Sequence, residues 1–486
     1  MPQTLSRRDL LRLGALSAGG LALAPFARAV SPPRRALRVV VVGAGVAGLI
    51  AAYELRTQGH EVTVLEAQMR SGGRILTVRD PFAEGLHAEM GAARIPENHD
   101  LTLRYARQFG LELDPFYPTS GAEVHLIQGQ RVLVPHGTPP DYSGVDHSLD
   151  LGDFGSMEEV MERLGPAMGP AMEASGDVRT PGWPSPASLR YDGLSINDFL
   201  RQQGLSDDAL DVLQIGIEPH SATKAPSALW VLSYFADDVG HPPRLKIQGG
   251  NDRLPAAFAA ELAEHIHYGA PVVRIAQDDG GVRATVRGTG GQFEVEGDAL
   301  VCTVPFPVLR RVEADPAFSP EKRRAINELH YAAVTRCAVQ VRERYWDPAT
   351  SGFGLTDHAA EVWHPSWDRP GARGILQSYM RGDLARRASG LDDDARRDLV
   401  LDQLEDVHPG IRDHAEGMVT KVWHEDEWAG GAHQLAQPGQ FEAHFHAAMR
   451  PEGRVYFAGE HVSPWPGWIQ GALHSGLRAV AEIIAD

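Results

Sequence analysis

The chain has little cysteine. Only Cys302 and Cys337 occur among 486 residues, and neither lies in a Cys-x-x-Cys pair. At most one disulfide can form, which excludes a disulfide-framed scaffold, a dithiol redox motif and a cysteine-rich zinc site. We therefore expect two buried thiols and no metal site.

Positive charge is also scarce. Lys and Arg number 46 against 64 Asp and Glu, which gives a formal net charge of −18. Nucleic acids and anionic lipids are polyanions, so this acidity disfavours both as partners. At 486 residues the chain is too long for one core, and two or three lobes are expected.

Long apolar runs are missing as well. The weakly apolar run from Leu13 to Ala24 is too short to span a bilayer, and no stable membrane anchor is expected. This run follows Arg7-Arg8 and precedes Ala27-Arg28-Ala29, a small-x-small cleavage site, so residues 1–29 are predicted to be a twin-arginine-type signal peptide. Export by the twin-arginine translocase to the periplasm or exterior, after folding in the cytoplasm, is expected. An ordinary secretory signal with a chance Arg-Arg pair is the alternative.

A dinucleotide site is predicted just after this segment. Leu37 to Val42 contains four consecutive valines, which is typical of a parallel strand buried on both faces. Gly43-Ala44-Gly45-Val46-Ala47-Gly48 follows and opens a helix to Gln58, and the next strand, Val62 to Leu65, ends at Glu66. This order of strand, glycines, helix, strand and acid predicts a Rossmann-type nucleotide-binding unit.

Each part of this unit has a role at the nucleotide. Gly43 permits the tight turn, Gly45 lets the backbone approach the pyrophosphate, and Gly48 lets the helix pack on the strand. The helix N-terminus faces the phosphates, and Glu66 accepts hydrogen bonds from ribose hydroxyls. An acid at this position disfavours NADP, while FAD and NAD both stay possible.

The following residues resemble a known family. Leu65-Glu66-Ala67-Gln68-Met69-Arg70-Ser71-Gly72-Gly73-Arg74 is similar to the extended FAD signature of the flavin amine oxidases, the superfamily of monoamine, polyamine and L-amino-acid oxidases. Ile247 to Pro255 with Ala270 to Ile275, and then Val455 to Ala472, resemble the family's middle and closing FAD segments. The resemblance runs from about residue 36 to the C-terminus. It implies an α/β fold with a Rossmann-type FAD-binding domain (36–70, 244–320 and 433–486), a mixed-sheet substrate-binding domain (71–135 and 321–432) and a helical lobe (136–243).

The resemblance also implies a noncovalently bound FAD. Arg74 is expected at its phosphates, Glu460 at its ribityl chain and Val272 near its adenine. Some relatives tether the flavin to a cysteine near the closing motif; here Ser463-Pro464-Trp465 stands there, and no Cys follows Cys337. The full set of expected cofactor contacts is Gly43, Gly45, Val46, Ala47, Gly48, Glu66, Ala67, Gly73, Arg74, Gly91, Ala92, Ala93, Arg94, Val272, Glu460, Trp468, Ile469, Gln470, Gly471 and Ala472.

The implied substrate residues are most similar to those of the L-amino-acid oxidases. In that group the arginine matching Arg94 pairs with the substrate carboxylate, and the tyrosine matching Tyr379 donates to it, which makes a suitable clamp. Gly467 and Trp468 are expected to contact the substrate, with the aromatic ring lining the amine pocket. Considered alone, Arg94 also fits a structural salt bridge, and Tyr379 also fits the core. Trp428 matches a family segment near the flavin, but a core position is the expectation for it.

One position departs from the family pattern. Members usually have a lysine that holds a water against flavin N5, and the best match in this chain is Arg336, after His330-Tyr331. Arginine is bulkier and does not lose its proton. Arg336 is therefore the candidate catalytic residue, while oxygen as the electron acceptor stays open; a different register is the alternative explanation.

The resemblance implies oxidative deamination of an L-amino acid, a small-molecule substrate. The Cα–H of the neutral amine passes as hydride to flavin N5, water hydrolyses the imine to an oxo acid and ammonia, and oxygen reoxidises the flavin to give hydrogen peroxide. The alternatives are an amine or polyamine oxidase in which Arg94 is structural, a decarboxylating amino-acid 2-monooxygenase, and a flavoprotein that does not turn over amines. A homodimer is expected.

Overall fold

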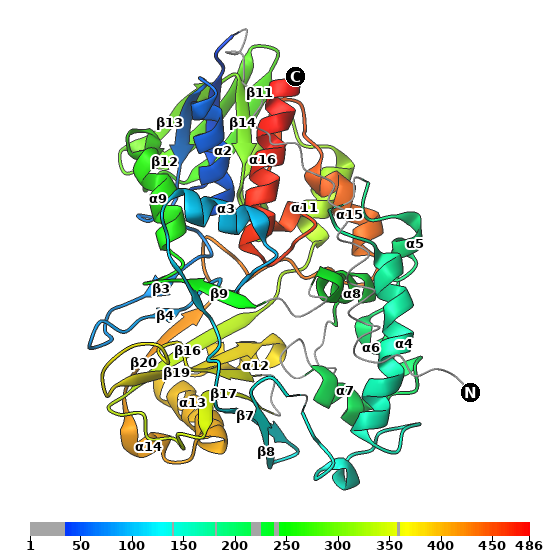
Figure 1. Cartoon of the computed structure of the whole chain (residues 1–486). Helices are drawn as coiled ribbons and strands as arrows, with labels where there is room; N and C mark the ends of the chain where they lie inside the picture. The colour runs from blue at the N-terminus through cyan, green and yellow to red at the C-terminus, as the bar shows by residue number, and fades with distance from the viewer. Residues whose placement is uncertain (1–34, 139, 180–181, 215–224, 238–242, 357–359) are drawn as a thin grey trace.

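The computed structural model describes residues 35–138, 140–179, 182–214, 225–237, 243–356 and 360–486. The predicted signal peptide, residues 1–29, lies outside this range. Figure 1 shows the nucleotide-binding part at the top, a large mixed sheet below it and a group of helices to one side. In the described part of the chain, no helix is long and apolar enough to cross a bilayer.

A five-stranded parallel sheet forms the centre of the nucleotide-binding part, in the order β10–β2–β1–β14–β21. Its strand β1 contains the predicted valine run, and all four valines are buried. Val39 and Val41 pack in the core with α2 and α16, while Val40 and Val42 pack on the opposite face. The elements are β1 (Arg38–Val42), α2 (Val46–Thr57), β2 (Glu61–Leu65), β10 (Ile266–His267), β14 (Ala299–Cys302), β21 (Val455–Phe457) and α16 (Ile469–Ala485).

A four-stranded sheet, β13–β12–β11–β15, covers that opposite face. Its alternating apolar residues, such as Val282 and Val286, share a core with Val40 and Val42. Both faces of β1 are therefore buried, which explains why apolar valines occur on both of them. The elements are β11 (Val272–Asp278), β12 (Gly281–Gly288), β13 (Gly291–Gly297), α10 (Phe306–Leu309), β15 (Glu313–Asp315), α11 (Pro320–Glu328) and α15 (Gln440–Met449).

A seven-stranded mixed sheet forms the second part, in the order β20–β16–β19–β18–β17–β7–β8. Only the β17–β7 pair is parallel among its described pairings. Cys337 on β16 and Leu376 on β19 lie on the face of the sheet that α12 and α13 cover. The residues on either side of them in each strand point the other way and face the nucleotide-binding part. The elements are β7 (Ala122–Ile127), β8 (Gln130–Pro135), β16 (Val334–Val341), β17 (Thr350–Leu355), β18 (Ala360–Trp363), β19 (Gly374–Arg381), α12 (Gly382–Ser389), α13 (Asp393–Val407), α14 (Ile411–His414) and β20 (Ala415–Val422).

A group of helices lies beside both parts (Figure 1). They share a core that contains Trp183, Phe199 and Leu229. The helices are η1 (Asp146–Ser148), α4 (Met157–Ser175), α5 (Pro186–Leu189), α6 (Ile196–Arg201), α7 (Asp207–Gln214) and α8 (Ala228–Asp237).

The hydrophobic cores do not follow the predicted division between the FAD-binding segment 36–70 and the substrate-binding segment 71–135. Helix α3 (Asp100–Gln108) was assigned to the substrate-binding segment, yet its Leu103 and Tyr105 are buried in the core of α2. The hydroxyl of Tyr105 also donates to Glu54 at 2.6 Å. Likewise, strand β9 pairs with strands from the segment assigned to the other domain. The remaining elements are β3 (Thr77–Val78), β4 (Ala88–Glu89), β5 (Ile95–Pro96), β6 (Leu113–Pro115), β9 (Arg244–Ile247), α9 (Arg253–Glu261), η2 (Ala263–His265) and η3 (Glu460–Val462).

Candidate active site

A long cavity of about 300 Å³ runs from the carboxyl end of the parallel sheet to the mixed sheet. This is the edge at which open α/β sheets bind their ligands. All of the predicted cofactor contacts line the cavity except Gly48, Gln470 and Gly471. The predicted substrate residues Arg94, Tyr379, Gly467 and Trp468 line it too, and so does Arg336.

The glycines at the start of α2 leave room for a phosphate group. A Cβ on Gly45 would meet nothing within 4 Å, and α2 begins there without a side-chain cap. The first N–H groups of the helix are therefore available to an anion at this end of the cavity. A Cβ on Gly48 would instead lie 2.0 Å from the carbonyl oxygen of Gly43, so Gly48 serves the packing of helix on strand.

Glu66 is held at the end of β2. Its Oε2 accepts from the Ala44 N–H at 2.6 Å and its Oε1 from the Gln68 N–H at 2.8 Å. Burial raises the pKa of Glu66 above its ordinary value, and the backbone donors oppose that shift. A fixed carboxylate that still faces the cavity fits the hydroxyls of a ribose.

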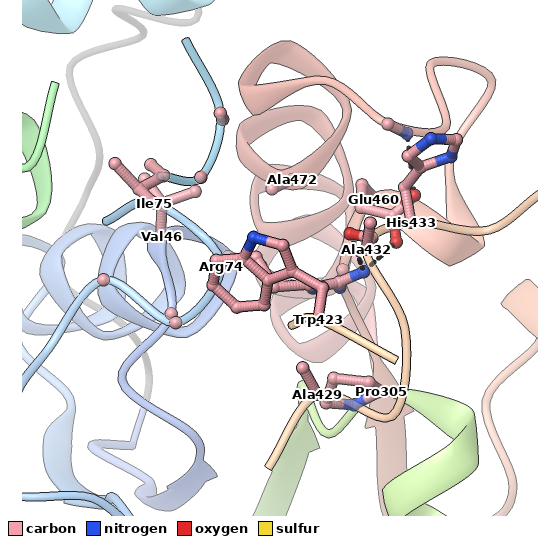
Figure 2. Close-up of a pocket in the computed structure, with 18 of the residues that line it drawn as sticks. Val46, Arg74, Ile75, Pro305, Trp423, Ala429, Ala432, His433, Glu460 and Ala472 are labelled. Atoms are coloured by element: carbon pink, nitrogen blue, oxygen red, sulfur yellow. Dashed lines mark hydrogen bonds and ion pairs between the residues drawn. The ribbon is translucent and has the colours of Figure 1, made fainter. Parts of the chain in front are cut away.

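Arg74 and Glu460 form the middle of the cavity. Arg74 Nη1 lies 2.5 Å from Glu460 Oε1 and 3.3 Å from the carbonyl oxygen of Ala432, as Figure 2 shows. Burial alone would raise the pKa of Glu460, but the adjacent Arg74 guanidinium lowers it below its ordinary value, so the carboxylate stays ionised. Its Oε2 also accepts from the Gly467 N–H at 2.8 Å. The pair offers a cation for phosphate and a carboxylate for a hydroxyl-bearing chain.

Two of the predicted cofactor contacts, Gln470 and Gly471, do not present a side chain to the cavity. Gln470 points away from the cavity: its Oε1 accepts from the N–H groups of Leu101 and Thr102, each at 3.1 Å, at the start of α3. A Cβ on Gly471 would lie 2.1 Å from the carbonyl oxygen of Trp465, so this glycine is required by packing. Both residues still belong to the first turn of α16, which faces the cavity through Ile469 and Ala472.

The mixed sheet supplies the other end of the cavity. Because side chains alternate along a strand, Val334 and Arg336 on β16 face the cavity, as do Tyr379 and Arg381 on β19. In register, Arg336 pairs with Tyr379, and Tyr379 pairs with Glu361 on β18. Three strands therefore place arginines, a phenol and a carboxylate at one spot.

Arg94 lies at the centre of this group and is already in an ion pair. Its Nη1 donates to Glu361 Oε2 at 3.2 Å and to the Tyr117 hydroxyl at 3.1 Å. The guanidinium carbon also lies 5.1 Å from the centroid of the Trp363 ring. The salt bridge considered for Arg94 is thus present, yet the side chain also lines the cavity and is 21% exposed.

Glu361 is the shared partner of two arginines. Arg381 Nη1 donates to its Oε1 at 2.7 Å, and the indole N–H of Trp363 donates to its Oε2 at 2.7 Å. Burial would raise the pKa of Glu361, but Arg94 and Arg381 lower it below its ordinary value. One ionised carboxylate therefore faces two guanidinium groups.

Arg336 adds a third guanidinium. Its Nη1 donates to the carbonyl oxygens of Glu89 and Gly91, which ties β16 to the segment that carries Arg94. Burial lowers the pKa of Arg336, with Tyr379 opposing the shift, but an arginine stays charged over the accessible pH range. Three cations and one anion leave this end of the cavity with an excess of two positive charges.

Aromatic side chains form the opposite wall. Trp468 stacks on Tyr234 with centroids 5.5 Å apart, and Trp230 stacks on His433 at 6.1 Å. Burial lowers the pKa of His433, so its imidazole is neutral near pH 7. The core position considered for Trp428 is wrong, because this residue is partly exposed and lines the cavity.

Sequence reasoning missed several residues of the site, among them Glu361, Trp363 and Arg381. Arg381 follows Tyr379 by two residues, and the period of two along a strand is the signal that could have identified it. Glu361 has no local signal, since its contact with Arg94 spans 267 positions. Among the described residues, no group of three or more His, Cys, Asp or Glu could hold a metal ion.

Known proteins match the chain over most of its length. The model of the flavin-containing amine oxidoreductase family matches residues 46–484. A flavin-dependent L-tryptophan oxidase of Lentzea aerocolonigenes is 32% identical over 479 residues, covering 92% of this chain and 98% of that protein. An L-amino-acid oxidase of Demansia vestigiata is 30% identical over 467 residues, covering 92% and 86%. A structure of putrescine oxidase bound to putrescine shares the fold, with a TM-score of 0.79 at 21% identity, covering 93% of this chain and all of that one.

Proposed function

The chain belongs to the flavin-containing amine oxidoreductases, and from this premise we propose that it oxidises L-amino acids to oxo acids. The family makes it a flavoenzyme that acts on CH–NH2 bonds, and the predicted α/β fold is confirmed. The observation that carries the proposal is the charge of the site. Arg94, Arg336 and Arg381 line one end of the cavity, and Glu361 is the carboxylate that Arg94 and Arg381 share.

This excess of positive charge favours a substrate that brings a carboxylate. Arg94 can offer a free edge of its guanidinium, since Nη1 alone holds Glu361 and Tyr117. The hydroxyl of Tyr379 lies on the same face of the sheet and can donate a further hydrogen bond. A diamine would instead place a second cation next to these arginines, which is electrostatically unfavourable in a partly dry cavity.

The aromatic wall suits the amine end of the substrate. Trp468 and Tyr234 exclude water and leave room for a neutral amine beside their rings. Gly467 precedes Trp468 with φ of +82°, and its N–H is fixed by Glu460. Clamping the carboxylate at one end and confining the amine at the other orients Cα, which is most of what the protein must do.

The residues also fit an FAD cofactor. When bound, it accepts the hydride from Cα and returns two electrons to an oxidant. Over one turnover the substrate loses a Cα–H and an N–H bond, water adds to the resulting C=N bond and releases ammonia, and oxygen takes two electrons and two protons to become hydrogen peroxide. Arg74, Glu66 and the N-terminus of α2 would hold the dinucleotide, while Trp363 and Tyr379 line the reacting end.

We propose that the FAD is bound noncovalently. Cys302 and Cys337 are both buried free thiols, and neither lines the cavity. Acid or heat precipitation of the yellow protein should therefore leave intact FAD in the supernatant. Flavin that stays with the precipitated polypeptide would contradict this.

An amine oxidase without carboxylate recognition is the second candidate. It is supported by the ion pair between Arg94 and Glu361, which could make Arg94 purely structural, and by the fold shared with putrescine oxidase. The two candidates differ in one measurable property. Peroxide release should be measured over a panel of L-amino acids and their decarboxylated amines. The proposal predicts activity with the acids and little with the amines; the reverse preference would overturn it.

A further inference from the structure

Arg381 has two hydrogen-bond donors without a partner. Its side chain is 7% exposed, and its Nη1 donates to Glu361 Oε1 at 2.7 Å. Its Nε and Nη2 are buried, yet neither has a hydrogen-bond partner in the structure. Buried donors in native proteins are nearly always paired, so these two point to a missing acceptor. Arg381 also lines the cavity, so a group bound in the cavity is the candidate for that acceptor.

The position of Arg381 places this acceptor beside the α-carboxylate clamp. Arg381 follows Tyr379 by two residues on β19, so both side chains leave the same face of the sheet. The guanidinium carbon of Arg381 lies 4.8 Å from the centroid of the Tyr379 ring. A group bound by Arg381 is therefore a neighbour of a group bound by Tyr379 and Arg94.

The charges of the cavity identify the chemistry of the acceptor. The carboxylates that line it are engaged: Glu66 by backbone N–H groups, Asp426 by Lys421 and Glu460 by Arg74. Glu361 offsets one of the three guanidinium groups at the substrate end. A substrate with a single carboxylate would offset the charge of a second guanidinium group and leave the charge of the third unbalanced.

We propose that the substrate carries a second carboxylate, and that the preferred substrates are acidic L-amino acids of the aspartate and glutamate class. This inference rests on the proposed function. Arg94 and Tyr379 hold the α-carboxylate, and Arg381 pairs through Nε and Nη2 with the side-chain carboxylate. Two parallel N–H donors match the two oxygens of a carboxylate. The product is then a dicarboxylic oxo acid, with ammonia and hydrogen peroxide formed as before.

A matched series of substrates tests this with the holoenzyme. L-Glutamate is compared with L-glutamine, which lacks only the side-chain charge, and with 4-aminobutanoate, which lacks only the α-carboxylate. L-Aspartate, L-asparagine and β-alanine form the shorter series, and L-leucine and L-methionine serve as neutral amino acids. We expect the better acidic substrate to exceed its amide in kcat/KM by about 10- to 150-fold, the range for one hydrogen-bonded charged contact.

Variants of Arg381 then locate the effect. Arg381→Gln should raise KM for the acidic substrate and remove most of the preference over the amide, while Arg381→Lys should restore part of it. The matched control is Arg386→Gln, an arginine on α12 that is 44% exposed and paired with Asp383 outside the cavity. It should leave the preference unchanged.

Ligand binding gives a readout that does not depend on turnover. A ligand that binds only the folded protein raises its unfolding temperature. Succinate and glutarate should stabilise the wild-type holoenzyme more than butanoate and pentanoate do at equal concentration. Because it uses the wild-type protein, this comparison tests recognition of a second carboxylate even if Arg381→Gln fails to fold.

The outcomes separate this inference from the proposed function. Oxidation of neutral L-amino acids with no preference for acidic ones would overturn the second carboxylate and leave the amino-acid oxidase intact. Oxidation of 4-aminobutanoate or β-alanine as readily as the α-amino acid would overturn the proposed function itself. Stabilisation by monocarboxylates equal to that by dicarboxylates would also overturn the role of Arg381.

Discussion

The guanidinium carbon of Arg336 lies 4.3 Å from the centroid of the Tyr379 ring, and the two residues are direct partners across β16 and β19. This contact fixes a permanent cation against a phenol that faces the substrate. The same guanidinium donates to the carbonyl oxygens of Glu89 and Gly91. Arg336 thus joins the sheet, the segment of Arg94 and the reacting end of the cavity.

This position of Arg336 makes its charge a candidate contributor to the reaction with oxygen. Oxygen gains negative charge as it is reduced, and a nearby fixed cation stabilises that change. Arg336→Met should slow reoxidation by roughly 10-fold or more, and Arg336→Lys should keep most of the wild-type rate. The measurement is the rate at which yellow colour returns when oxygen is mixed with the anaerobically reduced enzyme. Reoxidation of Arg336→Met at the wild-type rate would show that this charge has no part in the step.

Glu66 is predicted to hold the ribose of the cofactor. Glu66→Ala removes the acceptor and also the partner of the Ala44 and Gln68 N–H groups. The affinity for FAD should fall by about 1–3 kcal/mol, measured by titrating the apoprotein with FAD. Glu61→Ala, on the exposed first residue of the same strand, is the control. Unaltered FAD affinity in Glu66→Ala would place this acid away from the ribose.

Glu89 gives the protein a specific pH dependence. Burial raises its pKa from about 4.5 to about 7, although Asn251 and Thr77 donate to it. Below pH 4.5 the carboxyl is protonated in both folded and unfolded chains and adds no pH dependence. Between about pH 4.5 and 7 the unfolded chain ionises first, so the free energy of unfolding falls as the pH rises.

The substitution Glu89→Gln tests this account. It keeps an oxygen acceptor and removes the ionisation, so its stability relative to wild type should rise across that pH window. The gain at pH 8 should be on the order of 3 kcal/mol, since one pKa unit corresponds to about 1.4 kcal/mol. Thermal unfolding of both proteins between pH 4.5 and 8 measures it. Parallel pH profiles for wild type and variant would contradict the buried, protonated carboxyl.

Export by the twin-arginine route stays a prediction, carried by Arg7-Arg8 in residues 1–29. Replacing both arginines by lysine should keep the charge and trap the precursor in the cytoplasm. Cell fractionation followed by immunoblotting measures the distribution. Undiminished export of the double variant would indicate an ordinary secretory route.

The sequence predicts those parts of the molecule whose signals are local. The valine run of β1 and the glycines before α2 each follow from a few adjacent residues, and the structure confirms the fold built on them. The role of Gln470 could not be read in this way, because its partners at the start of α3 lie about 370 positions away. Helix α3, which lies in the segment predicted for the substrate-binding domain but packs in the core of α2, shows the same limit. Its apolar residues reveal a buried face but not which core buries it.

The substrate end of the cavity also combines residues that can be predicted from the sequence with residues that cannot. Arg94 and Tyr379 are predicted from the resemblance to the L-amino-acid oxidases, but their common neighbour Glu361 comes from a separate strand. The register of β18, β19 and β16 brings these groups together, and register depends on the whole sheet. The charge balance that supports amino-acid oxidation therefore emerges only from the structure.

Carboxylate recognition by Arg94 is the central claim, and one comparison tests it most directly. The kcat/KM for the best L-amino acid is divided by that for the same compound without its α-carboxyl group, in wild type and in Arg94→Ala. Wild type should strongly prefer the acid. The variant should lose about 2–5 kcal/mol of that preference, some thirty- to several-thousand-fold, while retaining FAD. An unchanged preference in a variant that still binds FAD would contradict the claim and favour an amine oxidase in which Arg94 is structural.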